Sequence, residues 1–546
     1  MSDFEVGQMT MARVGEHRVV MARTDTGLHA LDNACPHQGY GLVTGELQGE
    51  LITCQWHNWK FCVADGSALV GEEAVRCHPV EVVDGEVWVE VSTPTNAQQQ
   101  LELWPSLSRA IESDYRGQMA RDSARLLETG ADPADIVWHA LRIGAPKADY
   151  GVGHEMASAA DCVASLDLFD GLDRVLPILH ALAGISETTR DRVAYEPPEG
   201  DPSLSFSAAV EAERADDAVA AMRGALAEGA SVDTVRSWFI EAVSAHHLSY
   251  GHGAIYVQKA FELLERVGWD RADELLPHLT TSVVYGTRED TLPYMAKAIR
   301  AINNSDLQAM EAASDKSKSG WRGEQKLREA LLGSEEAPIA LAVEAALEGA
   351  GVSGVLDSVS LAVSERLLRY DPTTEHDPRA DFGWLDISHG LTYSRAARWA
   401  WEMYPSPATA RLALFAVFLC HDTGRLERRV GVGQPTQSDN QDGDLTLAIQ
   451  EGRAADAVAI ATRYKVDDAG DALRRVALSD AAGSFIVSAH LVKMARASWE
   501  EARAIGSNLP LMATARLAAS PRRERFVERA ALEAARFVRD GTPPTR

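Results

Sequence analysis

The chain changes its pattern of apolar and polar positions near residue 100. Before that point, short runs rich in Val and Ile alternate with turn signals, which is typical of β-strands. An Asp-Gly pair at 84–85 separates VEVV from EVWVEV and predicts a tight hairpin. The pattern therefore predicts a small all-β domain over residues 1–91, with strands that include 17–22, 51–53, 80–83 and 87–91.

From residue 101 onward, Ala, Leu, Glu and Arg dominate, and apolar residues recur at helical spacing. Runs such as VQKAFELLERV (257–267) and ATARLALFAVFL (408–419) each predict a helix. The polar, Pro-containing stretch STPTNAQQQ (92–100) is typical of a linker. We therefore predict a multidomain chain, in which the small all-β domain (1–91) and the linker (92–100) precede a large all-α helical-repeat domain (101–546).

The helical region repeats one phrase four times: a helix end with Gly, a short polar turn, and a new helix. The glycines are Gly130, Gly229, Gly349 and Gly452, roughly a hundred residues apart. This period is longer than that of the common solenoid repeats. After each phrase comes a helix-like stretch that opens with histidine, and in three units a second histidine follows. The opening set is His154, His252, His389 and His490, and the second set is His180, His278 and His421.

Charge limits the classes of function. The 546 residues include 80 acidic and 53 basic side chains, which gives a formal net charge of −27. Such a field repels phosphate backbones and anionic membranes, so we expect no nucleic acid and no membrane as partners. We also expect no signal peptide and no apolar run of the ~20 residues that a membrane span needs. The sequence predicts a soluble cytoplasmic protein.

Cysteine usage adds candidate chemistry. Four of the six cysteines lie in the first eighty residues, and in a reducing compartment such a group suggests metal ligands. Cys35-Pro-His37 is followed, after sixteen residues, by Cys54-Gln-Trp-His57. Two thiols and two imidazoles suit either a zinc ion or a mixed-ligand iron–sulfur cluster.

With its flanks NACPHQGYGLVTGEL and ITCQWHNWKF, this pattern resembles the Rieske ferredoxin motif, C-x-H followed by C-x-x-H. The resemblance implies a 2Fe-2S cluster in which Cys35 and Cys54 hold one iron and His37 and His57 hold the other. Neutral imidazoles raise the reduction potential relative to an all-cysteine cluster. High-potential respiratory members carry a cysteine soon after each ligand pair, but residues 38–40 contain none. The comparison therefore favours a low-potential cluster of the ferredoxin or oxygenase type.

Two further resemblances concern the helical region. The segments AHHLSYGHGAIYVQKAFELLERVGW (245–269) and LLPHLTTSVVYGTRED (275–290) resemble the questin-oxidase-like family, which is linked with Baeyer–Villiger-type oxidation. That resemblance implies an oxidase or oxygenase but assigns no catalytic residue. His389 is followed, 32 positions later, by His421 and Asp422. This arrangement is similar to the HD phosphohydrolase pattern, in which a His on one helix and a His-Asp pair on another bind metal. Both resemblances imply that histidines converge on a metal.

We therefore predict an iron–sulfur oxidoreductase, specifically an oxygenase. Its 2Fe-2S cluster would pass electrons to a His-rich metal site in the helical domain for O₂-dependent oxidation of an organic small molecule. No dinucleotide fingerprint occurs, so a separate ferredoxin or flavin reductase would supply electrons, and the chain is compatible with a homo-oligomer. The second centre, a non-haem iron or another metal, would take its ligands from His154, His180, His252, His278, His389, His421 and Asp422.

The alternative is a non-catalytic Rieske module for electron transfer or redox sensing, carried on a helical scaffold that docks partners. The two hypotheses differ in what they require of the histidines. Histidines that converge favour the enzyme, whereas histidines dispersed over surfaces and helix caps favour the scaffold.

Overall fold

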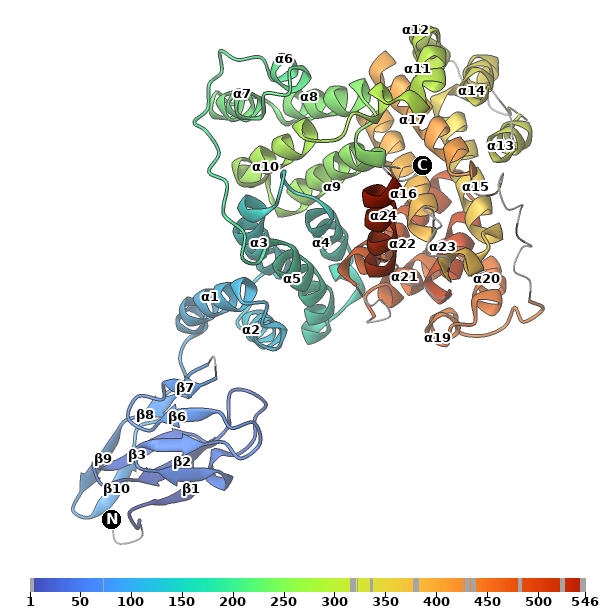
Figure 1. Cartoon of the computed structure of the whole chain (residues 1–546). Helices are drawn as coiled ribbons and strands as arrows, with labels where there is room; N and C mark the ends of the chain where they lie inside the picture. Colours follow the sequence, from blue (N-terminus) through green and yellow to red (C-terminus); the bar gives the residue numbers. More distant parts are fainter. Residues whose placement is uncertain are drawn as a thin grey trace. The chain divides into compact units, whose positions relative to one another are not determined.

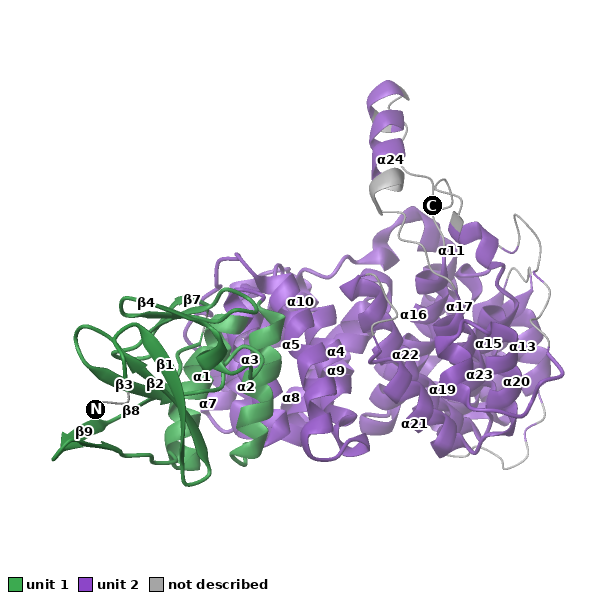
Figure 2. Cartoon of the chain, turned by 90° about the horizontal axis from the view of Figure 1, so that it is seen from below, with its two compact units in different colours: residues 1–110, 115–131 green, residues 111–114, 132–546 purple. Residues whose placement is uncertain are grey.

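The computed structural model divides into two compact units, which Figure 2 shows in different colours. The N-terminal unit comprises residues 1–110 and 115–131, and the helical unit comprises residues 111–114 and 132–546. The described residues are 4–540 without 72, 315–320, 322, 334–336, 377–382, 426, 428–432, 434–437, 480–483 and 521–525.

The described part of the N-terminal unit contains ten strands and two helices (Figure 1). The strands form three antiparallel sheets, in the orders β1-β2-β3-β8, β10-β9 and β4-β5-β6-β7. Their bounds are β1 Gln8–Val14, β2 His17–Arg23, β3 Leu28–Asp32, β4 Glu46–Gln48, β5 Leu51–Thr53, β6 Lys60–Cys62, β7 Ala68–Val70, β8 Cys77–His78, β9 Val80–Val83 and β10 Glu86–Val89. The helices are α1 Asn96–Glu112 and α2 Arg116–Glu128.

The predicted hairpin is present between β9 and β10. Asp84 and Gly85 both have positive φ angles, 53° and 86°, and Val83 pairs with Glu86 across the turn. This geometry matches the right-handed twist of the flanking strands, which explains why an Asp-Gly pair marks the turn. The prediction of a small all-β domain followed by a large helical region is confirmed.

Helix α1 begins inside the stretch for which the sequence predicts a linker. Thr95 and Gln98 form a capping box: the Gln98 side chain accepts from the Thr95 N–H at 2.9 Å, and Thr95 Oγ1 accepts from the Gln98 N–H at 3.3 Å. Tyr115, at the start of α2, packs against the core of the β domain. The compact unit therefore continues to residue 131, because the polar residues read as a linker start a helix instead.

The helical unit contains the remaining helices. They are α3 Pro133–Gly144, α4 His154–Ala164, α5 Val175–Thr189, α6 Phe206–Glu211, α7 Ala215–Ala227, α8 Val232–Ala245, α9 His252–Val267, α10 Ala272–Val284, α11 Ala296–Asn303, α12 Leu307–Ser314, α13 Glu324–Leu332, α14 Pro338–Ala345, α15 Gly351–Arg369, α16 Trp384–Met403, α17 Pro407–Asp422, α19 Leu445–Gln450, α20 Ala454–Arg463, α21 Val466–Val476, α22 Phe485–Ile505, α23 Leu509–Ala519 and α24 Phe526–Asp540.

Four of these helices form a ring. Helix α4 packs against α9, α9 against α16, α16 against α22, and α22 against α4. Figure 1 shows this group near the middle of the helical unit. Each ring helix contains one histidine of the opening set, so four segments that are distant in the sequence meet around one axis. These histidines are His154, His252, His389 and His490.

The repeated glycines lie at helix ends. Gly130, Gly229 and Gly452 have φ angles of 86°, 80° and 69°. At each, the N–H of the next residue bonds a carbonyl five positions earlier, which is the Schellman ending. Gly349 has a φ angle of 128° but lies inside a π-helical turn, Ala346–Ala350. Three of the four predicted repeats thus end a helix in the same way.

Among the described residues, Pro338–Arg369 is long and apolar enough to pass a length-and-composition test for a membrane span. This finding differs from the expectation that no such run occurs. Half of the stretch's most apolar window, 50%, is buried inside the structure. The stretch consists of α14, the π turn and α15, and α15 packs against α13, α16, α17 and α23, as a core helix does.

Candidate metal centres

The two loops that carry the predicted cluster ligands have the same backbone design. In the first, the Cys35 N–H donates to the carbonyl of Tyr40, and the Cys35 carbonyl accepts from the N–H of Gly39. In the second, Cys54 is bonded in the same way by Trp59 and Asn58. Gly39 and Asn58 both have positive φ, 77° and 60°. Each loop therefore curls back on its cysteine and presents the intervening side chains outward.

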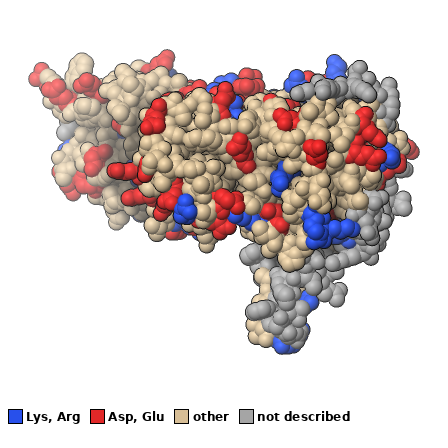
Figure 3. All heavy atoms as spheres, turned by 90° about the horizontal axis from the view of Figure 1, so that it is seen from above, with Lys and Arg blue, Asp and Glu red and all other residues tan. Residues whose placement is uncertain are grey.

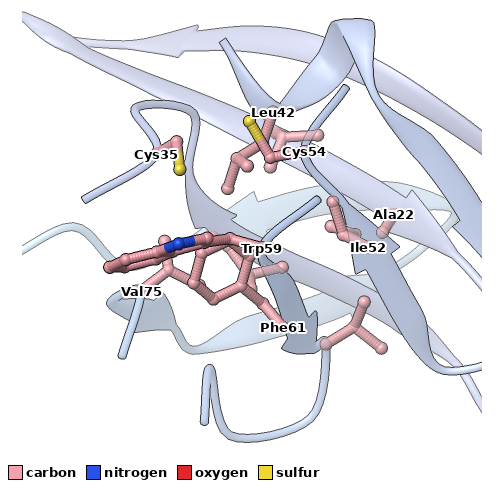
Figure 4. Packing of buried hydrophobic residues seen from close by; sticks show 11 residues of the cluster. Ala22, Cys35, Leu42, Ile52, Cys54, Trp59, Phe61 and Val75 are labelled. Atoms are coloured by element: carbon pink, nitrogen blue, oxygen red, sulfur yellow. The ribbon is translucent and has the colours of Figure 1, made fainter. Parts of the chain in front are cut away.

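The four predicted ligands lie together at the tips of these loops. Cys35 and Cys54 are buried at the edge of the core, beside Trp59 (Figure 4). The Nδ1 atoms of His37 and His57 are 3.1 Å apart, and the two rings are perpendicular. Trp59 stacks on His37 with ring centroids 4.8 Å apart. Two buried thiols on one side and two partly exposed imidazoles on the other fit the mixed donor set of a Rieske cluster.

The electrostatics of the thiol pair fit the same interpretation. Burial and the neighbouring Cys54 raise the pKa of Cys35 to about 11, although the backbone N–H groups of His37 and Gln38 act in the opposite direction. Without a cation, this pocket therefore keeps the thiol protonated. The same two N–H groups would stabilise a metal-bound thiolate by hydrogen bonds to sulfur.

Helix α2 holds the first loop in place. Arg121 and Arg125 both pair with Glu73, a carboxylate that is only 8% exposed, and the Arg121–Glu73 distance is 2.6 Å. Arg125 also donates to the carbonyl of Pro36 at 3.3 Å, between the two ligands of that loop. The guanidinium of Arg121 lies 5.8 Å from the Trp59 ring centre. The ligand loops thus depend on a helix outside the β domain.

A second group of donors lies in the helical unit. The ring-nitrogen donors of His154, His252, His389 and His490, one from each ring helix, all lie within 4.8 Å of one another. We call these four residues the histidine tetrad. Successive Nε2 atoms around it are 3.2, 2.9 and 3.2 Å apart. Separations of about 3 Å are those expected for nitrogens that each lie ~2.1 Å from one shared ion.

The other ring nitrogen of each histidine has a partner that orients the ring. The Nδ1 atoms of His389 and His490 donate to the carbonyls of Leu385 and Ile486, both at 2.6 Å. His252 Nδ1 donates to the Ser249 carbonyl at 2.5 Å. Because a carbonyl can only accept, Nδ1 carries the proton in these neutral rings. The Nε2 atoms of these three rings therefore present lone pairs to the centre. His154 Nδ1 shares a hydrogen bond with the Tyr256 hydroxyl at 2.9 Å.

Proton binding is disfavoured throughout the tetrad. Burial lowers the pKa of His252 to about 3, and burial lowers the pKa of the other three rings well below the usual range. Nitrogen lone pairs that face one another without a proton repel, and the Nδ1 hydrogen bonds of three rings hold them in this orientation. A metal cation at the centre removes this repulsion, and neutral imidazole suits iron, copper, zinc and nickel.

The turn before α9 shows local strain. Ser249, Tyr250 and Gly251 have consecutive positive φ angles of 47°, 59° and 92°. Two of these three residues are not glycine, so the conformation costs free energy that the surrounding structure must offset. The turn places the Ser249 carbonyl under the ring of His252. Strain and ligand orientation therefore occur at the same position.

A cavity opens next to the tetrad. Its volume is about 420 Å³, and it is lined by residues that precede α4, the end of α5 and the first turn of α22. His154 and Glu155 are part of its wall. The Glu155 carboxylate accepts from the Gly153 N–H at 2.7 Å, and burial raises the pKa of this carboxyl. A small molecule in the cavity would reach the tetrad from the side of His154.

The remaining predicted ligands lie elsewhere. His180, His278 and His421 belong to α5, α10 and α17, the helices that follow three of the ring helices. Asp422 pairs with Arg425 at 2.7 Å. These four residues are not in the tetrad, which is the group of possible metal ligands found among the described residues, and the HD-like set of His389, His421 and Asp422 is no part of it as a whole.

The fourth member of the tetrad, His490, opens the last repeat phrase but was not in the predicted ligand set. No second histidine follows it at the spacing seen in the other units. The signal that identifies it is its place after the repeated phrase, which it shares with the other three members. The predicted helix starts are correct for His154 and His252, but α16 and α22 begin at Trp384 and Phe485, ahead of His389 and His490.

Known proteins resemble the N-terminal unit. The Rieske 2Fe-2S domain family matches residues 1–82. The chain is 33% identical over 85 residues to the ferredoxin component of the alkene monooxygenase system of Xanthobacter autotrophicus, which covers 15% of this chain and 70% of that protein. It is 37% identical over 79 residues to the oxygenase subunit of carnitine monooxygenase from Acinetobacter baumannii, which covers 14% of this chain and 20% of that subunit.

A solved structure gives a similar match. The ferredoxin of carbazole 1,9a-dioxygenase from Nocardioides aromaticivorans IC177 is 25% identical, with 17% of this chain and 91% of that chain covered and a TM-score of 0.16. The family match ends at residue 82, so the two resemblances of the helical region stay predictions. The 2Fe-2S cofactor is confirmed, and relatives that are components of oxygenase systems support a general oxidoreductase role. Through its N-terminal residues, the chain belongs to the Rieske 2Fe-2S family.

Proposed function

We propose that this protein is an oxygenase whose helical unit binds a redox-active metal at the histidine tetrad. Electrons from the N-terminal unit would reach that metal, and O₂ would there oxidise an organic small molecule that enters through the adjacent cavity. A separate ferredoxin or flavin reductase would reduce the N-terminal unit.

The observation that carries this proposal is the orientation of the tetrad. Four neutral imidazoles from segments far apart in the sequence point their Nε2 atoms at one centre. Three of them are held in the tautomer with an unprotonated Nε2 by backbone carbonyls, the outer hydrogen bond that metal-ligating histidines usually make. A scaffold without a metal has no need of such an arrangement, and a core histidine is normally satisfied at both ring nitrogens.

The N-terminal ligand set supports the first half of the electron path. Cys35, Cys54, His37 and His57 would hold the cluster, which when bound supplies one electron at a time. His57 is exposed and His37 is partly exposed, so electrons would pass on the imidazole side. Figure 3 shows acidic side chains distributed over the face it draws, and an acidic surface favours a reductase with a basic docking patch.

The redox-module alternative makes a different prediction for metal content. It expects iron and sulfide in equal amounts and no other bound metal, because the cluster is then the only centre. The oxygenase proposal expects one further metal ion per chain at the tetrad. The two are therefore separated by elemental analysis.

The test is metal and acid-labile sulfide analysis of the full-length protein, purified without added metal. We expect about two sulfides per chain, and one metal ion beyond the cluster iron. The double variant H252A/H389A should lose that ion and keep the EPR spectrum of the cluster. The variant H278A is the matched control, since His278 is also buried but lies outside the tetrad. Equal iron and sulfide with no other metal, or an extra metal that the double variant retains, would refute the proposal.

A further inference from the structure

The fold buries the Lys493 side chain near the tetrad without a hydrogen-bond partner among the described residues. Lys493 follows His490 by three positions on α22, which places both on the same side of that helix. The residue is 1% exposed, and its Nζ atom has no hydrogen-bond partner. Its charge lowers the pKa of all four tetrad histidines, so the Lys493 side chain lies within electrostatic range of the whole tetrad.

A second buried lysine in the same unit, Lys259, differs from Lys493 because its ammonium group is paired with carboxylates. Lys259, on α9, is 3% exposed and pairs with Asp161 at 2.8 Å and with Glu262 at 3.2 Å. Asp161 is also 3.7 Å from Arg496. Asp161 therefore has other cations beside it, and neither Asp161 nor Glu155, the two carboxyls whose charges act on Lys493, gives Nζ a hydrogen bond.

The four tetrad ligands supply no negative charge to a bound metal, because all four imidazoles are neutral. Burial lowers the pKa of Lys493 to about 7, and the charges of Asp161 and Glu155 act in the opposite direction. A buried charged or polar group is strongly unfavourable unless a counter-ion or a hydrogen bond satisfies it. Lys493 Nζ has no hydrogen-bond partner among the described residues, so a metal-bound anion would supply the missing acceptor.

We propose that a small anion binds between the tetrad metal and Lys493, coordinating the metal at one end and accepting a hydrogen bond from Nζ at the other. This inference rests on the metal site of the proposed function and adds the class of its exogenous ligand. Lys493 is then a positioning residue for that ligand. Reduced forms of dioxygen belong to this class of small anions, as does azide.

The approach to this position is short. The cavity of about 420 Å³ has His154 and Glu155 in its wall, so a small ion can reach the metal without an opening of the ring helices. The charged side chains of the cavity wall are Glu155, Glu187 and the ion pair of Arg192 with Asp149.

Azide titration of the full-length protein loaded with one equivalent of Co(II) tests this assignment, with the EPR spectrum of Co(II) as the readout. We expect azide to bind the native protein about ten- to hundredfold more tightly than the variant K493M, the loss expected for one hydrogen bond from a charged donor. Co(II) itself should bind K493M at least as tightly, because a repelling cation has been removed. The variant K493R keeps the charge and should restore most of the azide affinity.

Several outcomes would overturn the inference. Equal azide affinity in native protein and K493M, with Co(II) bound at the tetrad, contradicts the role of Lys493 and leaves the metal site intact. Failure of Co(II) to bind, or binding that persists in H252A/H389A, refutes the metal site and the anion site together. Circular dichroism checks folding, and a K493M protein that is less stable without metal would point to a structural lysine. If K493M does not fold, the variant K493Q decides: loss of the charged donor should still weaken azide binding, and an azide affinity equal to that of the native protein contradicts the role of Lys493.

Discussion

Single hydrogen bonds decide what the tetrad can bind. If Nδ1 were the free nitrogen, each ring would present a donor to the centre and the site would suit an anion or water. The carbonyls of Leu385, Ile486 and Ser249 fix the opposite tautomer. His278 is equally buried and its pKa is also lowered, yet it faces no such group of nitrogens. A depressed pKa alone therefore does not identify a ligand.

His278 nonetheless predicts an acid sensitivity of the fold. Burial lowers the pKa of this ring from 6.5 to about 4, so the folded protein keeps it neutral where the unfolded chain protonates it. Between these values the unfolded state binds more protons, and stability falls as the pH falls. On going from pH 7 to pH 5 we expect the variant H278Q to lose about 2 kcal/mol less unfolding free energy than the native protein. Urea unfolding at the two pH values checks this, and equal losses would contradict it.

At the scale of elements, a buried ion pair aligns two ring helices. Arg398 on α16 donates to Glu501 on α22 through two hydrogen bonds, both of 2.9 Å, and Glu501 is fully buried. Ser360 on α15 adds a bond of 2.6 Å to the same carboxylate. Because these side chains have few other ways to be satisfied, the pair sets the register of α16 against α22 and hence the meeting of His389 and His490.

Removal of one partner of this pair should be costly. We expect the variant E501Q to lose about 3 kcal/mol of unfolding free energy, near the lower end for a broken buried pair, because Arg398 keeps Asp357 at 2.8 Å. The double variant R398M/E501L should recover most of that loss, since no buried charge of the pair is then left alone. Chemical unfolding of the metal-free proteins measures both. A double variant as unstable as E501Q would show that the pair contributes more than mutual compensation.

The elements differ in how far the sequence predicts them. Strands and the β9–β10 hairpin follow from local alternation and from Asp84-Gly85, whose conformation depends on the two residues themselves. The linker prediction is wrong at the start of α1, because Thr95 and Gln98 have the composition of a linker but the spacing of a capping box. The opening histidines were found by their equivalent positions. The sequence does not predict where the second set of histidines, His180, His278 and His421, lies. Spacing along the chain does not reveal that their helices, α5, α10 and α17, are not the four ring helices.

At the scale of the whole molecule, the family match and the folded unit have different lengths. The match to the Rieske family ends at residue 82, whereas the compact unit continues to residue 131. The additional part supplies Tyr115 to the core and two arginines to the buried carboxylate of Glu73. Helices α1 and α2 thus belong to the same compact unit as the β domain. Their sequence pattern nevertheless resembles that of the helical region that follows.

This difference predicts how fragments of the chain behave. A fragment of residues 1–131 keeps the contacts of Tyr115, Arg121 and Arg125, whereas a fragment of residues 1–91 exposes the apolar surface under Tyr115 and frees the Pro36 loop. Loss of even 1 kcal/mol shifts the melting temperature of a domain this small by about 4–8 °C, so we expect the shorter fragment to melt at least ~5 °C lower. Thermal unfolding followed by circular dichroism measures the shift, and the EPR spectrum of the cluster shows whether each fragment holds it. In the longer fragment, E73Q weakens both arginine contacts without a change of length, so it should lower the melting temperature in the same direction. Equal melting temperatures for the two fragments would mean that α1 and α2 pack on the β domain without stabilising it.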